Sequence, residues 1–349
     1  MPDSLSPSIA AARWGFTAPV SASPDAGLIN DTYLVGRPPQ AVLQWLNPIF
    51  APEVNRDIGR WAGRLREAGI VTPDVLPTSD GALWVDDPAG GCWRALSFVP
   101  GATLHRLRSP AQAAAVGALV GRVHAALDGW TPERSAPVRR IHDTPARMAE
   151  LEVALGAADG HPLAGPARAL GAAILADWSR WAGPRDVPDR ICHGDLKVSN
   201  VRFDAAGAEA VCLIDLDTVG PMDLPSELGD AWRSWCNPAG EDDPDGVVFD
   251  RDLFEASARA FLRHGPPLRA EERAGLPGAT ERICLELAAR FCADAVNNSY
   301  FREDRARFSQ PGAHNLHRAR CQHRLARAAA SARPFCESVL SDTGGAGSL

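Results

Sequence analysis

The chain has 349 residues, 45% of them hydrophobic, and a formal net charge of −7 at pH 7. This size and composition are typical of a globular protein with one large or two modest domains, and an acidic balance without a basic stripe argues against a nucleic-acid partner. We expect no membrane association, because no apolar run approaches the length of a membrane span and the first twelve residues lack the pattern of a signal peptide.

The eight cysteines form no Cys-x-x-Cys pair. Several lie in apolar surroundings, where a free cysteine behaves as a small hydrophobic residue. We therefore predict free thiols and a reducing, cytoplasmic location rather than a disulfide framework. We expect a monomer or a homodimer.

Residues 14 to 98 have the pattern of short strands with one helix between them. Apolar runs predict strands over residues 32–35 and 41–46, separated by the turn cluster 36–39. Further strands are expected over residues 82–85 and 93–99. The interposed helix is predicted over residues 53–68, where one apolar stripe recurs at helical spacing and Gly69 ends it. The stripe consists of Val54, Ile58, Trp61 and Leu65.

Beyond Pro100 and Gly101 the chain has a mainly helical pattern. Ser109 and Pro110 predict a helix start, and Gly129 predicts its end. The expected core stripe of this helix consists of Val116, Leu119, Val120, Val123 and Leu127. His124 lies beside that stripe, and we interpret it as a satisfied core residue rather than a ligand.

Five further helices are expected. One starts at Thr144 and Pro145, and another covers residues 163–181 with an interruption by Gly and Pro. Three more are predicted near residues 249–264, 281–300 and 313–331. The last carries many arginines, for which a solvated face is the default interpretation.

Two strand–turn segments lie between these helices. Residues 191–204 and 211–217 each contain a short apolar run, and Asp204 to Gly207 form the predicted turn. The polar loop within the first segment carries His193, Asp195, Lys197 and Asn200. Asp215 closes the second strand in this prediction.

The spacing Asp-x-Lys-x-x-Asn is that of a kinase catalytic loop. In this arrangement Asp195 accepts the proton of the substrate hydroxyl, while Asn200 and Asp215 hold a magnesium ion. Lys197 is the only lysine of the chain, and a compact ammonium suits a phosphoryl group in transfer better than a guanidinium does. The alternative is a polar loop that contains a lysine by chance.

At these residues the chain resembles the aminoglycoside phosphotransferase and choline kinase superfamily of small-molecule kinases. The softer similarity is to the N-acetylhexosamine 1-kinases, and it runs from about residue 25 to about residue 325. The segments that carry it, besides residues 193–200 and 214–218, are residues 27–35, 42–47, 141–147, 228–233 and 315–322.

The resemblance implies an α+β, protein-kinase-like fold with two lobes. The small β-rich lobe would cover residues 1–99, and the large, mainly helical lobe residues 100–349. Phe98 would lie in the hinge between them, where backbone groups bind adenine; an ordinary strand-to-helix turn is the alternative. Gly27, Asn30 and Thr32 would meet the nucleotide phosphates, although a plain surface hairpin is nearly as good an interpretation.

A departure from protein kinases occurs at residues 42–47. A kinase small lobe places a lysine on this strand, whereas Gln44 is the nearest match here. An amide offers hydrogen bonds without charge, so Gln44 is the candidate nucleotide-binding residue. The missing lysine leaves open a catalytically idle nucleotide-binding protein, although Asp195, Lys197, Asn200 and Asp215 are all present.

The resemblance also suggests residues around the catalytic loop. His193 and Asp230 would support that loop, and Asp217 could support the metal ligands without binding the metal itself. Candidates to bind the acceptor are Arg233, Asn298 and Tyr300. The acidic run at residues 241–245 is either a solvated loop or an amine-binding surface.

The sequence therefore predicts a kinase that uses ATP and Mg²⁺. The acceptor would be a small molecule with a hydroxyl group, first of all the anomeric hydroxyl of an N-acetylhexosamine or a related sugar or cyclitol. An aminoglycoside, another antibiotic or choline is the second choice.

Overall fold

The computed structural model describes residues 4–24, 29–138 and 140–342, and the chain divides into two compact units. Unit 1 comprises Met1–Thr103, Ala126–Arg139 and Asn200–Val219. Unit 2 comprises Leu104–Ala125, Arg140–Ser199 and Gly220–Leu349. Two later stretches of chain thus fold with the N-terminal strands, and the lobe boundary near residue 99 stays a prediction.

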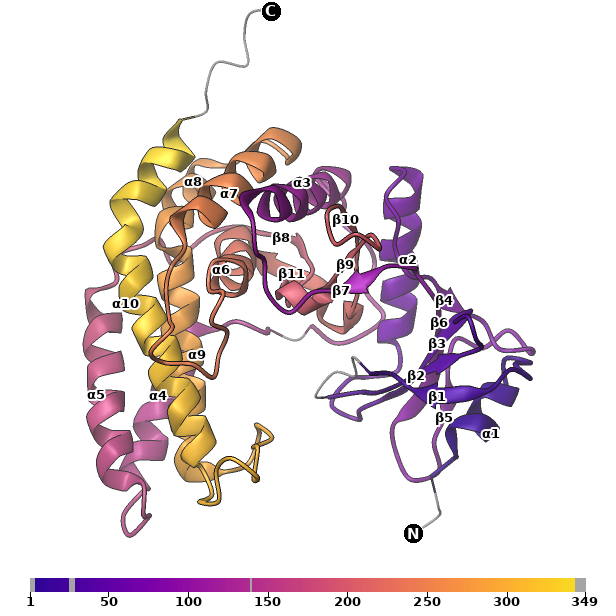
Figure 1. Ribbon diagram of the computed structural model, residues 1–349, viewed down its shortest axis with the longest axis horizontal. Helices are drawn as coiled ribbons and strands as arrows, with labels where there is room; N and C mark the ends of the chain where they lie inside the picture. Colours follow the sequence, from indigo (N-terminus) through magenta and orange to yellow (C-terminus); the bar gives the residue numbers. More distant parts are fainter. Residues whose placement is uncertain (1–3, 25–28, 139, 343–349) are drawn as a thin grey trace, which may run out of the picture. The chain divides into compact units, whose positions relative to one another are not determined.

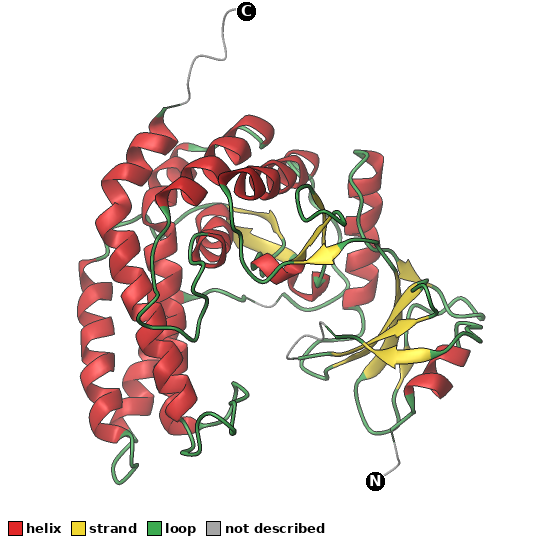
Figure 2. Ribbon diagram, in the orientation of Figure 1, coloured by secondary structure: helices red, strands yellow, loops and turns green. Residues whose placement is uncertain are grey.

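An antiparallel sheet of six strands forms the centre of unit 1 (Figures 1 and 2). Its strands are β1 (Val20–Ala22), β2 (Asp31–Val35), β3 (Ala41–Leu46), β4 (Val75–Leu76), β5 (Val85–Asp86) and β6 (Cys92–Ser97). The order is β1-β2-β3-β6-β4, and β5 also pairs with β6. The strands predicted over 32–35 and 41–46 are confirmed. The next two are shorter or shifted, because β5 begins only at Val85 and β6 ends at Ser97.

The described residues of unit 1 contain two α-helices. The four residues of the predicted apolar stripe are all buried in α2 (Val54–Glu67), which confirms this helix. The chain leaves α2 through Gly69, whose φ of +72° is one that glycine adopts at little cost. Helix α1 (Pro7–Ala12) was not predicted, although Ser6 and Pro7 form a capped start in which the Ser6 side chain accepts from the amide of Ile9.

A second sheet in unit 1 joins chain segments that are far apart in sequence. It contains β7 (Ala102–Thr103), β9 (Val201–Phe203) and β10 (Ala210–Leu213) in the order β10-β9-β7. The hairpin of β9 and β10 turns where the sequence predicts, since the Gly207 amide donates to the Asp204 carbonyl over 3.0 Å.

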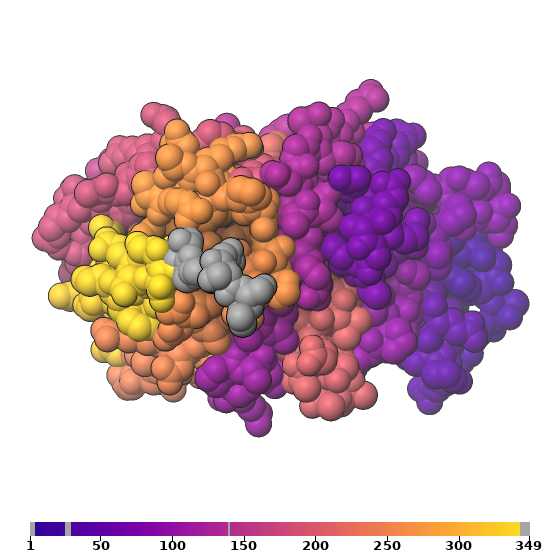
Figure 3. Space-filling model, turned by 90° about the horizontal axis from the view of Figure 1, so that it is seen from above, coloured from indigo at the N-terminus to yellow at the C-terminus, as the bar shows by residue number. Residues whose placement is uncertain are grey.

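Unit 2 is mainly helical. Its helices are α3 (Pro110–Ala126), α4 (Thr144–Gly156), α5 (Ala164–Arg180), α6 (Leu224–Trp235), α7 (Arg251–His264), α8 (Ala270–Gly275), η3 (Leu276–Gly278), α9 (Ala279–Asn297) and α10 (Ala313–Ser341). Helix α9 is the central one and packs against α4, α5, α6 and α10 (Figure 1). Strands β8 (Asp189–Cys192) and β11 (Gly220–Asp223) pair antiparallel beside them. Figure 3 shows yellow atoms, from the end of α10, beside orange atoms from earlier parts of unit 2.

Several helices of unit 2 differ from the sequence-based expectation. The interruption predicted within residues 163–181 is wrong, because Pro166 lies in the first turn of α5, where an amide donor is not needed. Helix α10 continues to Ser341, past Pro334, instead of ending near residue 331. Helices α6 and α8 were not predicted.

All eight cysteines are unpaired and buried, as predicted. The core stripe of α3 is buried as well, and His124 lies within that core with 2% of its surface exposed. Across residues 4–24, 29–138 and 140–342, none of the helices combines the length and the apolar character needed to cross a bilayer.

Candidate active site

The loop that follows β8 is held by a buried carboxylate. The backbone amides of His193 and Gly194 donate to the two oxygens of Glu227 over 2.7 and 2.8 Å. Burial by itself raises the pKa of Glu227, but hydrogen bonding and charge from His124 and the loop lower it. Glu227 therefore holds the loop as an ionised acceptor. The sequence assigned this support to Asp230, three residues later, and gave no signal for Glu227.

Two further bonds from α6 fix the second half of the loop. The indole of Trp235 donates to the carbonyl of Leu196 over 2.8 Å, and the amide of Val198 donates to the Ser234 hydroxyl over 3.0 Å. Leu196 and Val198 are themselves buried. Because side chains of α6 bind both halves of the loop, the loop geometry is defined from within unit 2.

Asp195 and Lys197 form an ion pair in this loop. The Lys197 ammonium lies 2.5 Å from Oδ2 of Asp195, and the Asp195 amide donates to Nδ1 of His193 over 3.2 Å. Burial raises the pKa of the Asp195 carboxyl, but the charge and hydrogen bond of Lys197 more than compensate, so the pKa is lowered. Asp195 is thus an ionised carboxylate at neutral pH, as a proton acceptor requires. His193 contacts the loop as its predicted supporting role requires.

The two predicted metal ligands lie at neighbouring backbone positions in unit 1. Asn200 ends η1 (Val198–Asn200), and its carbonyl accepts a 2.9 Å hydrogen bond from the amide of Ile214. Asp215 comes next, in the left-handed conformation with φ 64° and ψ 60°. The prediction that Asp215 closes the strand is wrong, because the strand ends at Leu213. Asp215 instead occupies the N-cap position of η2 (Leu216–Thr218). One carboxylate and one amide on adjacent segments fit the oxygen ligands that Mg²⁺ prefers.

The predicted nucleotide-binding residues have protein partners in unit 1. Gln44 donates to the Thr32 hydroxyl over 3.0 Å, and Asn30 donates to a carboxylate oxygen of Asp217 over 2.6 Å. Gln44 also accepts from Arg94, a buried residue that the sequence analysis did not single out. Gly27 lies outside the described residues. A role of Gln44, Asn30 and Thr32 at the nucleotide stays a prediction.

The predicted hinge segment is fastened to β9 by Arg202. Its guanidinium lies 5.8 Å from the centre of the Phe98 ring and donates to the Gly101 carbonyl over 2.5 Å and to Thr103 over 2.8 Å. At Gly101, where φ is +141°, a Cβ atom would lie 2.0 Å from the carbonyl oxygen of Phe203. Only glycine allows this close approach of two backbones.

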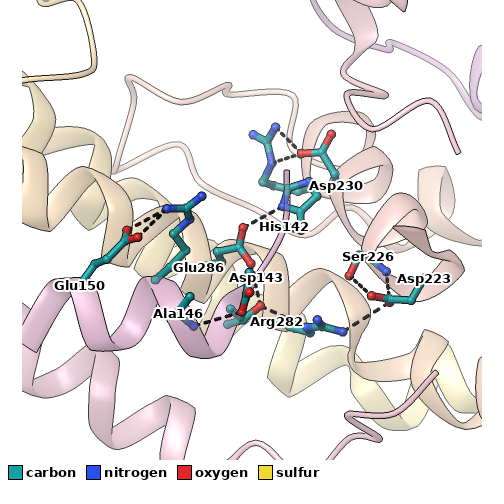
Figure 4. Close-up of polar contacts among 12 residues, drawn as sticks. His142, Asp143, Ala146, Glu150, Asp223, Ser226, Asp230, Arg282 and Glu286 are labelled. Atoms are coloured by element: carbon teal, nitrogen blue, oxygen red, sulfur yellow. Dashed lines mark hydrogen bonds and ion pairs between the residues drawn. The ribbon is translucent and has the colours of Figure 1, made fainter. Parts of the chain in front are cut away.

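The three predicted acceptor-binding residues occupy different surroundings in unit 2. Arg233 is buried in α6 and donates to Asp230 over 2.9 and 3.1 Å (Figure 4). Asn298 ends α9 in the left-handed conformation, with φ 48°, and is exposed, as is Tyr300. Burial opposes the charge of Arg233, but Asp230 and Glu241 raise its pKa, so it remains a cation.

Asp294 organises the exposed segment that carries Tyr300. Its carboxylate accepts hydrogen bonds from the amides of Ser299, Tyr300 and Phe301 and from the side chain of Asn315. Asp294 is 5% exposed. Asp294 could not be identified from the sequence, because neither a motif nor a spacing relates it to the segment it binds.

A buried polar cluster connects the start of α4 with α9 (Figure 4). Glu286 accepts from Thr144 over 2.7 Å and lies 2.8 Å from Nδ1 of His142. Arg282 links Thr144 to Asp223, the cap of α6. Burial lowers the pKa of His142, but the charge and hydrogen bond of Glu286 raise it by more, so the net shift is upward. This shift in pKa favours the charged form of His142 opposite the Glu286 carboxylate.

The acidic run at residues 241–245 is half-buried to exposed, as a solvated loop would be, but several of its carboxylates also have counter-charges. Glu241 pairs with Arg233 over 2.6 Å, and Asp245 pairs with Arg324 of α10 over 2.8 Å. Asp242 lies 2.8 Å from Nε2 of His314. Side chains of unit 2 already compensate much of the negative charge of the run.

Comparisons with known proteins place the chain among phosphotransferases. A family model described as the phosphotransferase enzyme family matches residues 22–268. The chain is similar to the solved structure of a microcompartment-associated aminopropanol kinase, with 18% identity and a TM-score of 0.62 over 93% of this chain and 96% of that one. It is also similar to an aminoglycoside phosphotransferase from Alicyclobacillus acidocaldarius, with 17% identity and a TM-score of 0.60 over 97% of this chain and 98% of that one. A third similar structure is the amicoumacin kinase hAmiN in complex with AMP-PNP, Ca²⁺ and Ami, with 15% identity and a TM-score of 0.58 over 93% of this chain and 88% of that one. These similarities confirm the predicted kinase-like fold, with its strand-rich and helical parts.

Proposed function

Since the chain belongs to the phosphotransferase enzyme family, we propose that it transfers the γ-phosphoryl group of Mg-ATP to a sugar hydroxyl. It is a small-molecule phosphotransferase with a hydroxyl group as acceptor. The acceptor we propose is an N-acetylhexosamine or a related sugar or cyclitol, phosphorylated at its anomeric hydroxyl. The N-acetylhexosamine 1-kinase branch is part of this proposal.

The observation that carries the reaction type is the Asp195–Lys197 pair on a loop fixed by α6. Asp195 orients the acceptor hydroxyl and takes its proton while the new O–P bond forms and the bond between the γ-phosphorus and ADP breaks. The Lys197 ammonium faces the negative charge of the phosphoryl group. A catalytically idle protein, the remaining alternative, needs neither residue.

The use of ATP and Mg²⁺ as cofactors is part of the same proposal. Asn200 and Asp215 would hold Mg²⁺, which supplies positive charge beside the phosphates when bound. Two solved structures with the same fold support a nucleotide and a divalent cation as cofactors. The amicoumacin kinase structure is a complex with AMP-PNP and Ca²⁺, and the structure of an aminoglycoside 2'-phosphotransferase-IIIa is a GDP complex.

A sugar is favoured over a polycationic antibiotic by the acidic run. An aminoglycoside carries several ammonium groups, which need acidic residues without counter-charges to bind them. In this chain Glu241 and Asp245 already pair with arginines, and Asp242 lies against His314. A neutral acceptor needs only hydrogen bonds from such a surface.

The test is an ADP-release assay with N-acetylhexosamines, aminoglycosides and choline as acceptors. We expect turnover with an N-acetylhexosamine and its loss, by about a hundredfold or more, in Asp195→Asn. Phosphorus NMR of the product identifies the phosphorylated oxygen. Turnover with aminoglycosides alone would reject the proposed acceptor, and equal turnover in Asp195→Asn would reject the role of Asp195.

A further inference from the structure

A fully buried arginine, Arg94, lies in the unit 1 sheet in one row of cross-strand neighbours with Thr32 and Gln44. In the register of the sheet, Thr32 of β2 lies opposite Gln44 of β3, and Gln44 lies opposite Arg94 of β6. Residues directly opposite each other in antiparallel strands project from the same face. The strand position at which kinases carry a lysine is therefore flanked by a cation on the next strand.

Hydrogen bonds define how this row is connected. Oε1 of Gln44 accepts from Nε and Nη2 of Arg94 over 3.0 and 2.7 Å, and Nε2 of Gln44 donates to Thr32 over 3.0 Å. A guanidinium can only donate, so the amide oxygen of Gln44 must face it. Both ends of the amide are thereby occupied, and Gln44 orients Arg94.

The third nitrogen of Arg94 binds a carboxylate from a distant part of the chain. Nη1 donates to Oδ1 of Asp217, and each of these two side chains is 1% exposed. Oδ2 of Asp217 accepts from Asn30, whose own side-chain oxygen accepts from the amide of Asn47. One carboxylate oxygen of Asp217 is thus held by Arg94 of the sheet and the other by Asn30, which precedes β2.

Asp217 lies two residues after Asp215. Before Asp215, the amide of Ile214 bonds to the carbonyl of Asn200, and after it the Arg94–Asp217 pair fixes η2. Asp215 itself has the left-handed conformation that costs energy for a residue with a Cβ. Contacts on both sides of Asp215 therefore support it in this conformation.

We propose that Arg94 is a positioning residue, which holds the metal-binding carboxylate of Asp215 in place through Asp217. Here a cation on β6 pairs with an aspartate of η2, whereas in protein kinases a lysine on β3 pairs with a helix glutamate. The inference rests on the proposed metal role of Asp215, and it gives Gln44 the task of orienting Arg94.

The test measures the affinity for a paramagnetic metal, Mn²⁺, by electron paramagnetic resonance in the presence of AMP-PNP. We expect Arg94→Lys and Asp217→Asn each to weaken Mn²⁺ binding about tenfold or more. A lysine cannot bind Gln44 and Asp217 at the same time, as the guanidinium does, and an asparagine at position 217 carries no charge, so either change loosens the segment after Asp215. The double variant should be little worse than either single one, since both remove the same contact. The KM for the acceptor should change less than twofold in each variant.

The matched control is Arg190→Lys, which alters another buried ion pair, Arg190–Glu272 in unit 2, with side chains 7% and 0% exposed. It should leave Mn²⁺ affinity unchanged even where it lowers the unfolding temperature. Wild-type Mn²⁺ affinity in folded Arg94→Lys or, should that variant fail to fold, in Asp217→Asn would overturn the proposal. So would an equal loss in Arg190→Lys. Wild-type protein that binds no Mn²⁺ with AMP-PNP would reject the metal site itself, and the inference with it.

Discussion

At the scale of single residues, Lys197 contacts Asp195 and, in the proposed function, also faces the phosphoryl group. Its ammonium is 2.5 Å from the Asp195 carboxylate. We expect Lys197→Met to lower kcat about a hundredfold or more with little change in KM, because the lost charge acts mainly in the transition state. Lys197→Arg should recover only part of the loss, since a planar guanidinium cannot occupy the same position.

The same variant tests the pKa of Asp195. Burial alone raises this pKa and Lys197 lowers it, so Lys197→Met should move the acidic limb of the kcat/KM profile to higher pH. The measurement is a pH–rate profile of both proteins. An unchanged acidic limb would separate Lys197 from the ionisation of Asp195.

His142 gives the fold a pH-dependent contribution. Its pKa is raised by Glu286, and a raised histidine pKa stabilises the folded state fully below the unfolded value, about 6.5, and loses this effect as pH rises through the folded value. We expect the free energy of unfolding lost in His142→Gln to be largest near pH 6 and to decrease towards pH 9. Urea unfolding at a series of pH values measures this, with His105→Gln at an exposed position as the control. A loss that grows with pH would contradict the assignment.

At the scale of elements, two glycines inside helices distinguish the effect of close helix packing on stability from the effect of helix propensity. A Cβ at Gly117 of α3 would lie 2.2 Å from the Ser257 carbonyl oxygen of α7, whereas a Cβ at Gly63 of α2 would meet nothing within 4 Å. We expect Gly117→Ala to destabilise the protein by about 1–3 kcal/mol. Gly63→Ala should stabilise it by about 0.5–1 kcal/mol. Thermal unfolding of both variants checks the prediction, and equal shifts would contradict it.

Elements defined by local patterns were predicted well from the sequence. The stripe from Val54 to Leu65 and the turn at Asp204 to Gly207 depend on neighbours in the chain, and both are confirmed. The pairing of β8 with β11 was not predicted, because it joins residues about thirty positions apart and neither strand exceeds four residues. Short runs of this kind carry too little periodicity to reveal a partner.

The candidate site shows the same division. Asp195, Lys197 and Asn200 lie in one loop, so their spacing alone indicated a kinase. Glu227 lies 33 residues from Gly194, and Asp217 lies 123 residues from Arg94. Such contacts depend on the tertiary fold, and a single sequence contains no periodic or spacing signal for them.

At the scale of the whole molecule, the burial of all eight cysteines makes thiol reactivity a measure of unfolding. Burial raises the pKa of Cys212 and Cys292 to about 12, and a protonated, inaccessible thiol reacts slowly. A thiol reagent should therefore modify almost no cysteine in the native protein and all eight in concentrated guanidinium. Val153→Cys, at a position 73% exposed, should add one fast-reacting thiol. Rapid modification of several native cysteines would contradict this structure.

The division of unit 1 into three stretches of chain has a consequence for biosynthesis. Arg94 leaves the ribosome 123 residues before Asp217, which at ~5–20 residues per second is a delay of roughly 6–25 seconds. During this interval the sheet strands exist without the counter-ion that their buried cation needs. In the nascent N-terminal segment, the Arg94 charge therefore has to be stabilised by water or by a chaperone until residues 200–219 are made. A protein cut after Thr103 would remain in that incomplete state.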